Sequence, residues 1–124
     1  MDRIGVRRRL IPVVLAILAM LMLTRPAVGH HGWSWYNNDV LTTLTGVVEE
    51  VSFGNPHGYI RLNAEGQIWN LTLAPPGRML RANFTREVIA VGDEATVEGH
   101  VNLNDPTEMK VERVTVRGVG YQLY

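Results

Sequence analysis

The chain has 124 residues, with 12 basic and 12 acidic side chains, zero formal net charge and no cysteine. This length allows one small domain and leaves no room for two hydrophobic cores. The zero charge argues against a strongly basic nucleic-acid binder. The absence of cysteine excludes a disulfide scaffold, a thiol nucleophile and a zinc site with cysteine ligands.

The first 29 residues have the pattern of a secretory signal peptide. Four arginines lie among the first nine residues, and residues 10–23 are apolar apart from Pro12. Small residues are required one and three positions before a cleavage site. Gly29 and Ala27 occupy these positions for a cut after Gly29. We therefore expect a periplasmic protein, exported through a signal helix that is removed.

An uncleaved membrane anchor is the alternative interpretation of this segment. The 15 residues between Arg9 and Arg25 would span about 22 Å as a helix, whereas a membrane core is about 30 Å thick. This difference favours cleavage, so contact with the membrane is expected only during export. Arg7 and Arg8 also loosely fit the twin-arginine export route. Cleavage removes a net charge of +4 and leaves a mature chain of 95 residues with a net charge of −4.

The mature chain shows the alternation of apolar and polar residues that is typical of strands. Five strands are expected, at residues 40–53, 59–63, 67–73, 95–101 and 109–116. A short helix is expected at residues 78–83, between the third and fourth strands. This order predicts an all-β fold, a small five-stranded OB-like barrel over residues 40–124. A small open sandwich is the alternative architecture.

Individual positions refine this prediction. Trp69 is expected in the core, and Met79 and Leu80 are expected to face inward from the helix. Gly46 suggests a bulge or sharp bend in the first strand, and a change of phase predicts a bulge near Glu112 in the last. His100 falls on the polar face of its strand and is expected to face solvent.

Three histidines are the candidate metal ligands. Cleavage after Gly29 would make His30 the N-terminal residue, whose free amine and ring nitrogen can chelate one ion. His31 or His57 could supply a third nitrogen, and such sites suit copper or zinc. Pro56 stiffens the loop that carries His57. Alternatively, the histidine pair is a solvated tail and the loop is a tight turn in which His57 bonds to the backbone.

Residues 30–39, here called the arm, are rich in histidine and aromatic residues and are expected to be extended. Two-residue spacing would place Trp33 and Trp35 on the face that carries His31. With Tyr36 and Asn55 they are the candidate ligand-binding residues. They could stack on a sugar or another flat ligand, or pin the arm to the barrel.

The sequence offers no clear catalytic constellation. It has neither a Ser/His/Asp order nor a Gly-rich phosphate loop, and Glu49 and Glu50 should point to opposite faces of a strand. We therefore expect a non-enzymatic domain that binds a metal ion or an unidentified small ligand, and no nucleic acid. The alternatives are a carbohydrate or protein interaction module that uses the aromatic residues of the arm, and a copper-dependent oxidative enzyme built on terminal His30.

The chain resembles an uncharacterised bacterial family of small exported proteins. The resemblance covers roughly residues 30–117 and rests on an ordered set of short motifs. These are His30-His31, Thr45-Gly46-Val47-Val48, Asn55-Pro56-His57, Trp69, the region of Leu80 and Phe84, and Gly92-Asp93 before Thr96-Val97. Members often have serine after the histidine pair and tryptophan near Phe84, where this chain has Gly32 and Phe84 itself. The resemblance implies export to the periplasm and carries no established activity.

Overall fold

The structure is a computed structural model that describes residues 32–124, and the predicted signal peptide lies outside these residues. The described elements are η1 (Trp33–Trp35), β1 (Thr42–Ser52), β2 (Tyr59–Ala64), β3 (Gln67–Thr72), α2 (Pro76–Arg81), β4 (Glu94–Val101), β5 (Glu108–Val116) and β6 (Val119–Gln122). Neither described helix has the length and apolar character needed to cross a membrane. Residues 33–124 form one compact unit.

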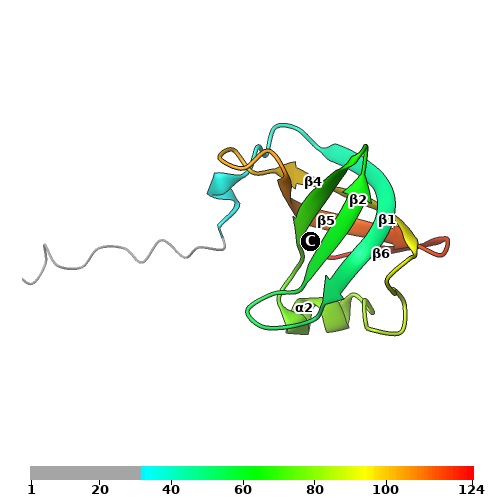
Figure 1. The fold of residues 1–124 in the computed structure, drawn as a ribbon. Coiled ribbons are helices and arrows are strands. Elements are labelled where there is room, and N and C mark those ends of the chain that lie inside the picture. The colour runs from blue at the N-terminus through cyan, green and yellow to red at the C-terminus, as the bar shows by residue number, and fades with distance from the viewer. Residues whose placement is uncertain (1–31) are drawn as a thin grey trace, which may run out of the picture. The chain divides into compact units, whose positions relative to one another are not determined.

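Five of the strands close into a barrel (Figure 1). β1 pairs with β2 on one side and with β4 on the other, while β2 continues to β3 and β4 continues to β5, all antiparallel. A parallel pairing of β3 with β5 joins the two ends of this sheet. The closed order, with α2 between β3 and β4, confirms the predicted OB-like barrel. Closure protects the strand edges of a domain that has no disulfides.

The barrel interior is filled by the apolar residues that alternate along the strands. On β2, for example, Ile60 and Leu62 are fully buried, and on β3 Trp69 is buried as predicted. Met79 of α2 is also buried, but Leu80 is 68% exposed, so the prediction that it faces inward is wrong. Successive residues of a helix differ by about 100° in direction, and a helix this short turns one face to the barrel.

Two bulges change the direction of acidic side chains. In β5 the pairing with β4 passes from Arg113 to Val111, which leaves Glu112 as the extra residue and confirms the predicted bulge. In β1 the extra residue is Glu49. Glu49 accepts a hydrogen bond from Asn63, and Glu50 from Tyr59. Both partners lie on the exposed face of β2, so the expectation that the two glutamates point to opposite faces is wrong.

Gly46 serves a close approach of strands, and the bulge of β1 lies three residues later, at Glu49. A Cβ atom at Gly46 would lie 2.2 Å from the carbonyl oxygen of Asn63, far closer than van der Waals contact allows. Gly99 has the same role in β4, where a Cβ would lie 2.1 Å from the carbonyl oxygen of Lys110. These two glycines therefore let β1 and β4 cross their neighbours tightly as the barrel curves.

β6 is a strand that the sequence pattern does not predict. It follows β5 through Arg117 and Gly118, whose φ angles are 53° and 76°. Two consecutive positive φ angles make the turn that joins tightly twisted strands, and Asn-Gly is its usual sequence signal. Arg-Gly is a weaker signal, so the sequence pattern does not predict this hairpin. β6 leads to the C-terminal residues Leu123 and Tyr124, which pack against the barrel.

Candidate functional site

Residues 33–39 of the arm are held on the barrel beside the loop after β4 (Figure 1). Trp33–Trp35 form a single turn of 3₁₀ helix rather than the extended segment expected from the sequence. The arm then bonds to the barrel through its backbone, with Leu103 N–H donating to the Trp35 carbonyl at 2.8 Å and Asn37 N–H donating to the Val101 carbonyl at 2.9 Å. The turn points Trp33 and Trp35 in different directions. Trp33 is half-buried, while Trp35 is 39% exposed.

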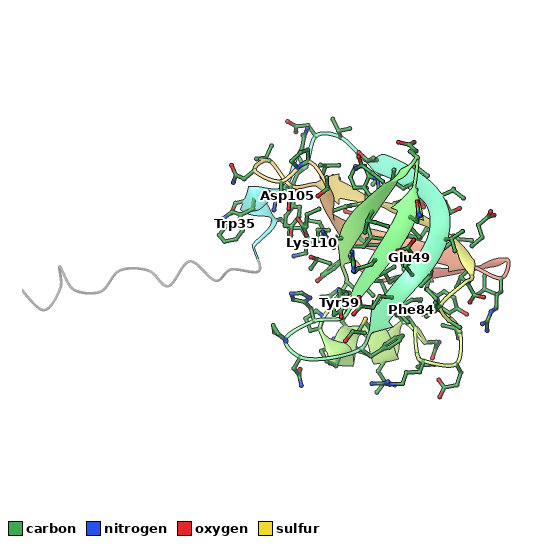
Figure 2. The ribbon with its side chains drawn as sticks, viewed as in Figure 1. Trp35, Glu49, Tyr59, Phe84, Asp105 and Lys110 are labelled. Atoms are coloured by element: carbon green, nitrogen blue, oxygen red, sulfur yellow. The ribbon has the colours of Figure 1, made fainter. Side chains whose placement is uncertain are left out.

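Lys110 lies beneath the arm and is only 5% exposed, although it is on the outer face of β5 (Figure 2). Its Nζ lies 4.3 Å from the centroid of the Trp33 ring, 5.2 Å from that of Tyr124 and 5.8 Å from that of Tyr36. Cations within about 6 Å of an aromatic face are attracted by its electron density. Burial lowers the pKa of Lys110, and the charge of Glu108 opposes part of that change. We call Trp33, Tyr36, Lys110 and Tyr124 the lysine cage.

Glu108 connects the lysine cage to β3. Its Oε1 accepts hydrogen bonds from the Tyr36 hydroxyl at 2.9 Å and the Thr72 hydroxyl at 2.6 Å. Burial, followed by the hydrogen bond to Glu108, raises the pKa of Tyr36 to about 12. Tyr36 therefore stays protonated and remains a donor at neutral pH. The buried Oε2 of Glu108 has no hydrogen-bond partner among the described residues.

His100 lies next to the cage and is buried, contrary to the expectation that it faces solvent. Nδ1 is 2.8 Å from the Val40 carbonyl oxygen and 3.0 Å from that of Asn37. Nε2 is 3.0 Å from a carboxylate oxygen of Glu112, the bulged residue of β5. The two carbonyls and an ionised carboxylate are acceptors, so this setting favours the protonated ring, in which both nitrogens donate. In that form neither nitrogen has a lone pair for a metal ion.

His57 lies half-buried in the loop between β1 and β2, where Asn55 is exposed and joined to Pro56 by a cis peptide bond. The Nδ1 atom of His57 is 3.0 Å from the carbonyl oxygen of Gly58. A carbonyl accepts only, so Nδ1 carries the proton and Nε2 carries the lone pair in the neutral ring. This is the tautomer that metal-binding histidines adopt when a backbone carbonyl orients them.

The strand register brings this loop and the lysine cage to one side of the barrel. Tyr59 of β2 pairs with Thr72 of β3, which pairs in turn with Lys110 of β5. Neighbouring strands are about 4.8 Å apart, so the backbones at Tyr59 and Lys110 are about 10 Å apart. His57 precedes Tyr59 by two residues, and Trp33 stacks on Lys110. Trp33 and the histidine loop therefore flank the same region.

The described residues do not by themselves make a metal site. Residues 32–124 contain no group of three histidine, aspartate or glutamate side chains that could hold an ion. Of the three predicted ligands, His57 is described, and His30 and His31 lie outside the described residues. A site with three protein ligands would need those two residues.

The sequence pattern did not identify the residues that hold the arm on the barrel. Glu108, Lys110 and Glu112 alternate with buried residues of β5, the usual pattern of a solvent-facing row. The available signal was indirect: a segment with two tryptophans and a tyrosine must bury those rings against something. Charged residues that alternate along a strand give no sign in the sequence that another segment covers them.

Residues 18–109 match a family described as "Family of unknown function (DUF6152)", which covers most of the chain. No curated protein matches the sequence.

The lysine cage predicts unequal roles for the two tryptophans of the arm. Trp33→Ala removes the ring closest to Lys110 and should lower the free energy of unfolding by about 2 kcal/mol, less than the loss for a fully buried tryptophan. Trp35→Ala, which removes a ring outside the cage, is the matched control and should lower it by less. Urea denaturation of both variants measures the difference. Equal losses would show that the cage does not anchor the arm.

The surroundings of His100 predict a pH-dependent contribution to stability. Burial lowers the pKa of His100, but hydrogen bonds to Glu112, Val40 and Asn37 outweigh it and raise the pKa above its ordinary value. A group with a raised pKa stabilises the fold fully below its unfolded pKa, and that contribution is lost as pH rises through the folded pKa.

His100→Gln should therefore destabilise the protein more at about pH 5.5 than at about pH 8.5. Urea denaturation of wild type and variant at both values measures this. Glu112→Gln should weaken the pH dependence because it removes the carboxylate facing Nε2. A His100→Gln loss that grows with pH would contradict a cationic ring.

Proposed function

We propose that this chain, which belongs to a family of unknown function (DUF6152), is an exported bacterial protein that binds copper or zinc in the periplasm. The ligands would be His30, His31 and His57. Export is supported by the basic, apolar and small-residue order of the first 29 residues. The role proposed is binding, with no catalytic step.

The observation that carries this proposal is the setting of His57. Its Nδ1 faces the Gly58 carbonyl oxygen at 3.0 Å, in a loop that is partly buried. Histidines that bind metals usually donate their second N–H to such a carbonyl, which fixes the ring and raises the basicity of the ligand nitrogen. His100 lacks this property because both of its nitrogens face acceptors.

The length of chain before Trp33 also supports the proposal. His30 precedes Trp33 by three residues, and an extended chain covers at most about 3.5 Å for each residue. The first histidine can therefore reach about 10 Å from the anchored ring. The loop that carries His57 flanks the same region, as the pairing of Tyr59, Thr72 and Lys110 requires.

The donor set selects the class of metal. After cleavage behind Gly29, His30 would offer its terminal amine and a ring nitrogen, and His31 or His57 would add an imidazole. A set made only of nitrogen donors suits copper and zinc, whereas magnesium and calcium prefer oxygen ligands.

Calorimetric titration of the exported, processed protein with Cu(II) and with Zn(II) tests this function. We expect one ion to bind each chain with a dissociation constant below about 10 μM, which corresponds to about −7 kcal/mol. His57→Gln should weaken binding at least about tenfold because it removes a ligand. Gln67→Ala, at an exposed position where β3 begins, is the control and should leave the affinity unchanged. Binding weaker than about 10 μM for both metals would refute the proposal. An N-terminus other than His30 would rule out chelation by the terminal amine and ring nitrogen of that residue.

An interaction module for carbohydrates or proteins is the second candidate, and the exposure of Trp35 favours it. Trp35 is 39% exposed, and its neighbour Leu103 is 63% exposed. Trp33 and Tyr36 are committed to the lysine cage, so this function would rest mainly on Trp35. Trp35→Ala separates the two candidates because it removes that contact residue without changing a histidine.

A further inference from the structure

His100 of β4 joins the last residues of the arm to the bulge of β5. On one side its Nδ1 lies 2.8 Å from the Val40 carbonyl oxygen and 3.0 Å from the Asn37 carbonyl oxygen. On the other side its Nε2 lies 3.0 Å from Oε1 of Glu112. The ring is only 8% exposed, so water does not replace these contacts while the structure stays closed. A change in the number of ring protons therefore acts on the arm, on the bulge or on both.

The protonated ring suits both sides, because each nitrogen then donates to an acceptor. The neutral ring keeps one N–H, so one nitrogen turns a lone pair toward oxygen atoms. If Nε2 loses the proton, that lone pair faces the charged carboxylate of Glu112. If Nδ1 loses it, the lone pair faces two neutral carbonyls. A charged acceptor holds a donor more strongly than a neutral one does, so we expect Nε2 to keep the proton and Nδ1 to lose it.

Residues 37–40 are the part of the arm with the fewest other contacts to the barrel. The Asn37 N–H donates to the Val101 carbonyl at 2.9 Å, but the Val40 N–H turns back to the Asn37 carbonyl at 3.3 Å. Residues 38–40 are exposed. Trp33 and Tyr36, by contrast, are held in the lysine cage. Loss of the two contacts to His100 would therefore affect residues 37–40 first.

Two charged groups of β5 set the protonation of His100. Glu112 is in contact with Nε2 and favours the protonated ring. Lys110 is the partner of His100 in the register of β4 and β5, and its positive charge opposes a second cation nearby. The Trp33 ring contacts both, with its centroid 5.8 Å from that of His100 and 4.3 Å from the Lys110 Nζ. The proton on His100 therefore depends on the Glu112 carboxylate.

The other titratable groups around His100 keep their charge state as the ring titrates. Asp39 of the arm and Glu98 of β4 are carboxylates, which carry a constant charge above about pH 6. Burial raises the pKa of Tyr36 to about 12 and also raises the pKa of Tyr124, so both hydroxyls stay neutral. A change in the arm near neutral pH therefore points to the imidazole.

We propose that His100 is a pH-sensitive switch, which holds residues 37–40 on the barrel when its ring is protonated and releases them when the ring is neutral. The proton leaves Nδ1 for water, and the Asn37 and Val40 carbonyls separate from the ring. The lysine cage keeps Trp33 in place, so the release is local and the barrel stays folded. The switch uses none of the proposed metal ligands.

The direction of the switch follows from the contacts of the ring. Burial lowers the pKa of His100, but the hydrogen bonds to Glu112, Val40 and Asn37 outweigh it and leave the pKa above its ordinary value, which is about 6.5. The arm is therefore held at acidic and neutral pH. It is released as the pH rises through the raised pKa.

A pH titration of the purified protein from about pH 5.5 to about pH 9, followed by nuclear magnetic resonance, tests the switch. The ring nitrogen shifts of His100 report its protonation and tautomer directly, and the carbonyl carbon shifts of Asn37 and Val40 report the two contacts. We expect the neutral ring to keep its proton on Nε2 and both carbonyl signals to move with the midpoint of the ring. A neutral ring with its proton on Nδ1 would overturn the proposal, as would carbonyl signals that do not follow the ring.

Amide hydrogen exchange separates local release from unfolding. Between the two ends of the titration, the protection factor of the Asn37 amide should fall at least about tenfold, while amides of β2 and β3 keep theirs. An equal fall in all of these amides would mean that the whole barrel opens, and it would overturn a local switch.

Glu112→Gln separates the switch from a merely structural role of His100. The side-chain amide of this variant can donate to a lone pair on Nε2, so the neutral ring keeps its proton on Nδ1 and its bonds to Asn37 and Val40. We therefore expect residues 37–40 to stay in place at high pH. Glu98→Gln removes an equal charge two residues from His100, and as the matched control it should behave as wild type. Release that persists in Glu112→Gln, or that disappears equally in Glu98→Gln, would overturn the proposal.

Discussion

One side of this protein is arranged around the buried ammonium group of Lys110. A charge on the outer face of a barrel strand would ordinarily remain in water, because removing it from water is expensive. Here the rings of Trp33, Tyr36 and Tyr124 surround it, and Glu108 lies close by. These contacts give the arm a fixed position at the junction of β3, β4 and β5.

The bulge at Glu112 contributes to the same arrangement by holding the C-terminal residues on the barrel. Its carboxylate faces His100, and its carbonyl oxygen accepts a hydrogen bond from the Leu123 N–H at 2.7 Å. One irregular residue of β5 thus contacts both the buried His100 and the C-terminal residues. Tyr124, placed in this way, completes the lysine cage, with its ring 4.9 Å from that of Trp33. The first and last described parts of the chain therefore stabilise each other on the barrel.

The sequence predicted the barrel well because alternation along a strand reports burial inside the barrel directly. Ile60, Leu62 and Trp69 lie where their pattern places them, and the change of phase near Glu112 marks a real bulge. The same rule failed for His100, and it gave no sign that Lys110 is buried. Polar residues on the outer face look solvent-facing until another segment covers them, and the pattern of one strand carries no information about that segment. The prediction that Leu80 faces inward was wrong for a related reason. A helix of six residues has too few positions for its sequence to define a buried face.

These contacts matter for the proposed metal site, because they hold Trp33, three residues after His30, on the side of the barrel that carries His57. The most direct test follows the imidazole nitrogens of the protein that begins at His30, by long-range proton–nitrogen correlation spectra with and without Zn(II). We expect Zn(II) to shift Nε2 of His57, to leave its Nδ1 protonated, and to leave both nitrogens of His100 unchanged. Unchanged nitrogens of His57 in the presence of saturating Zn(II) would contradict the proposed site.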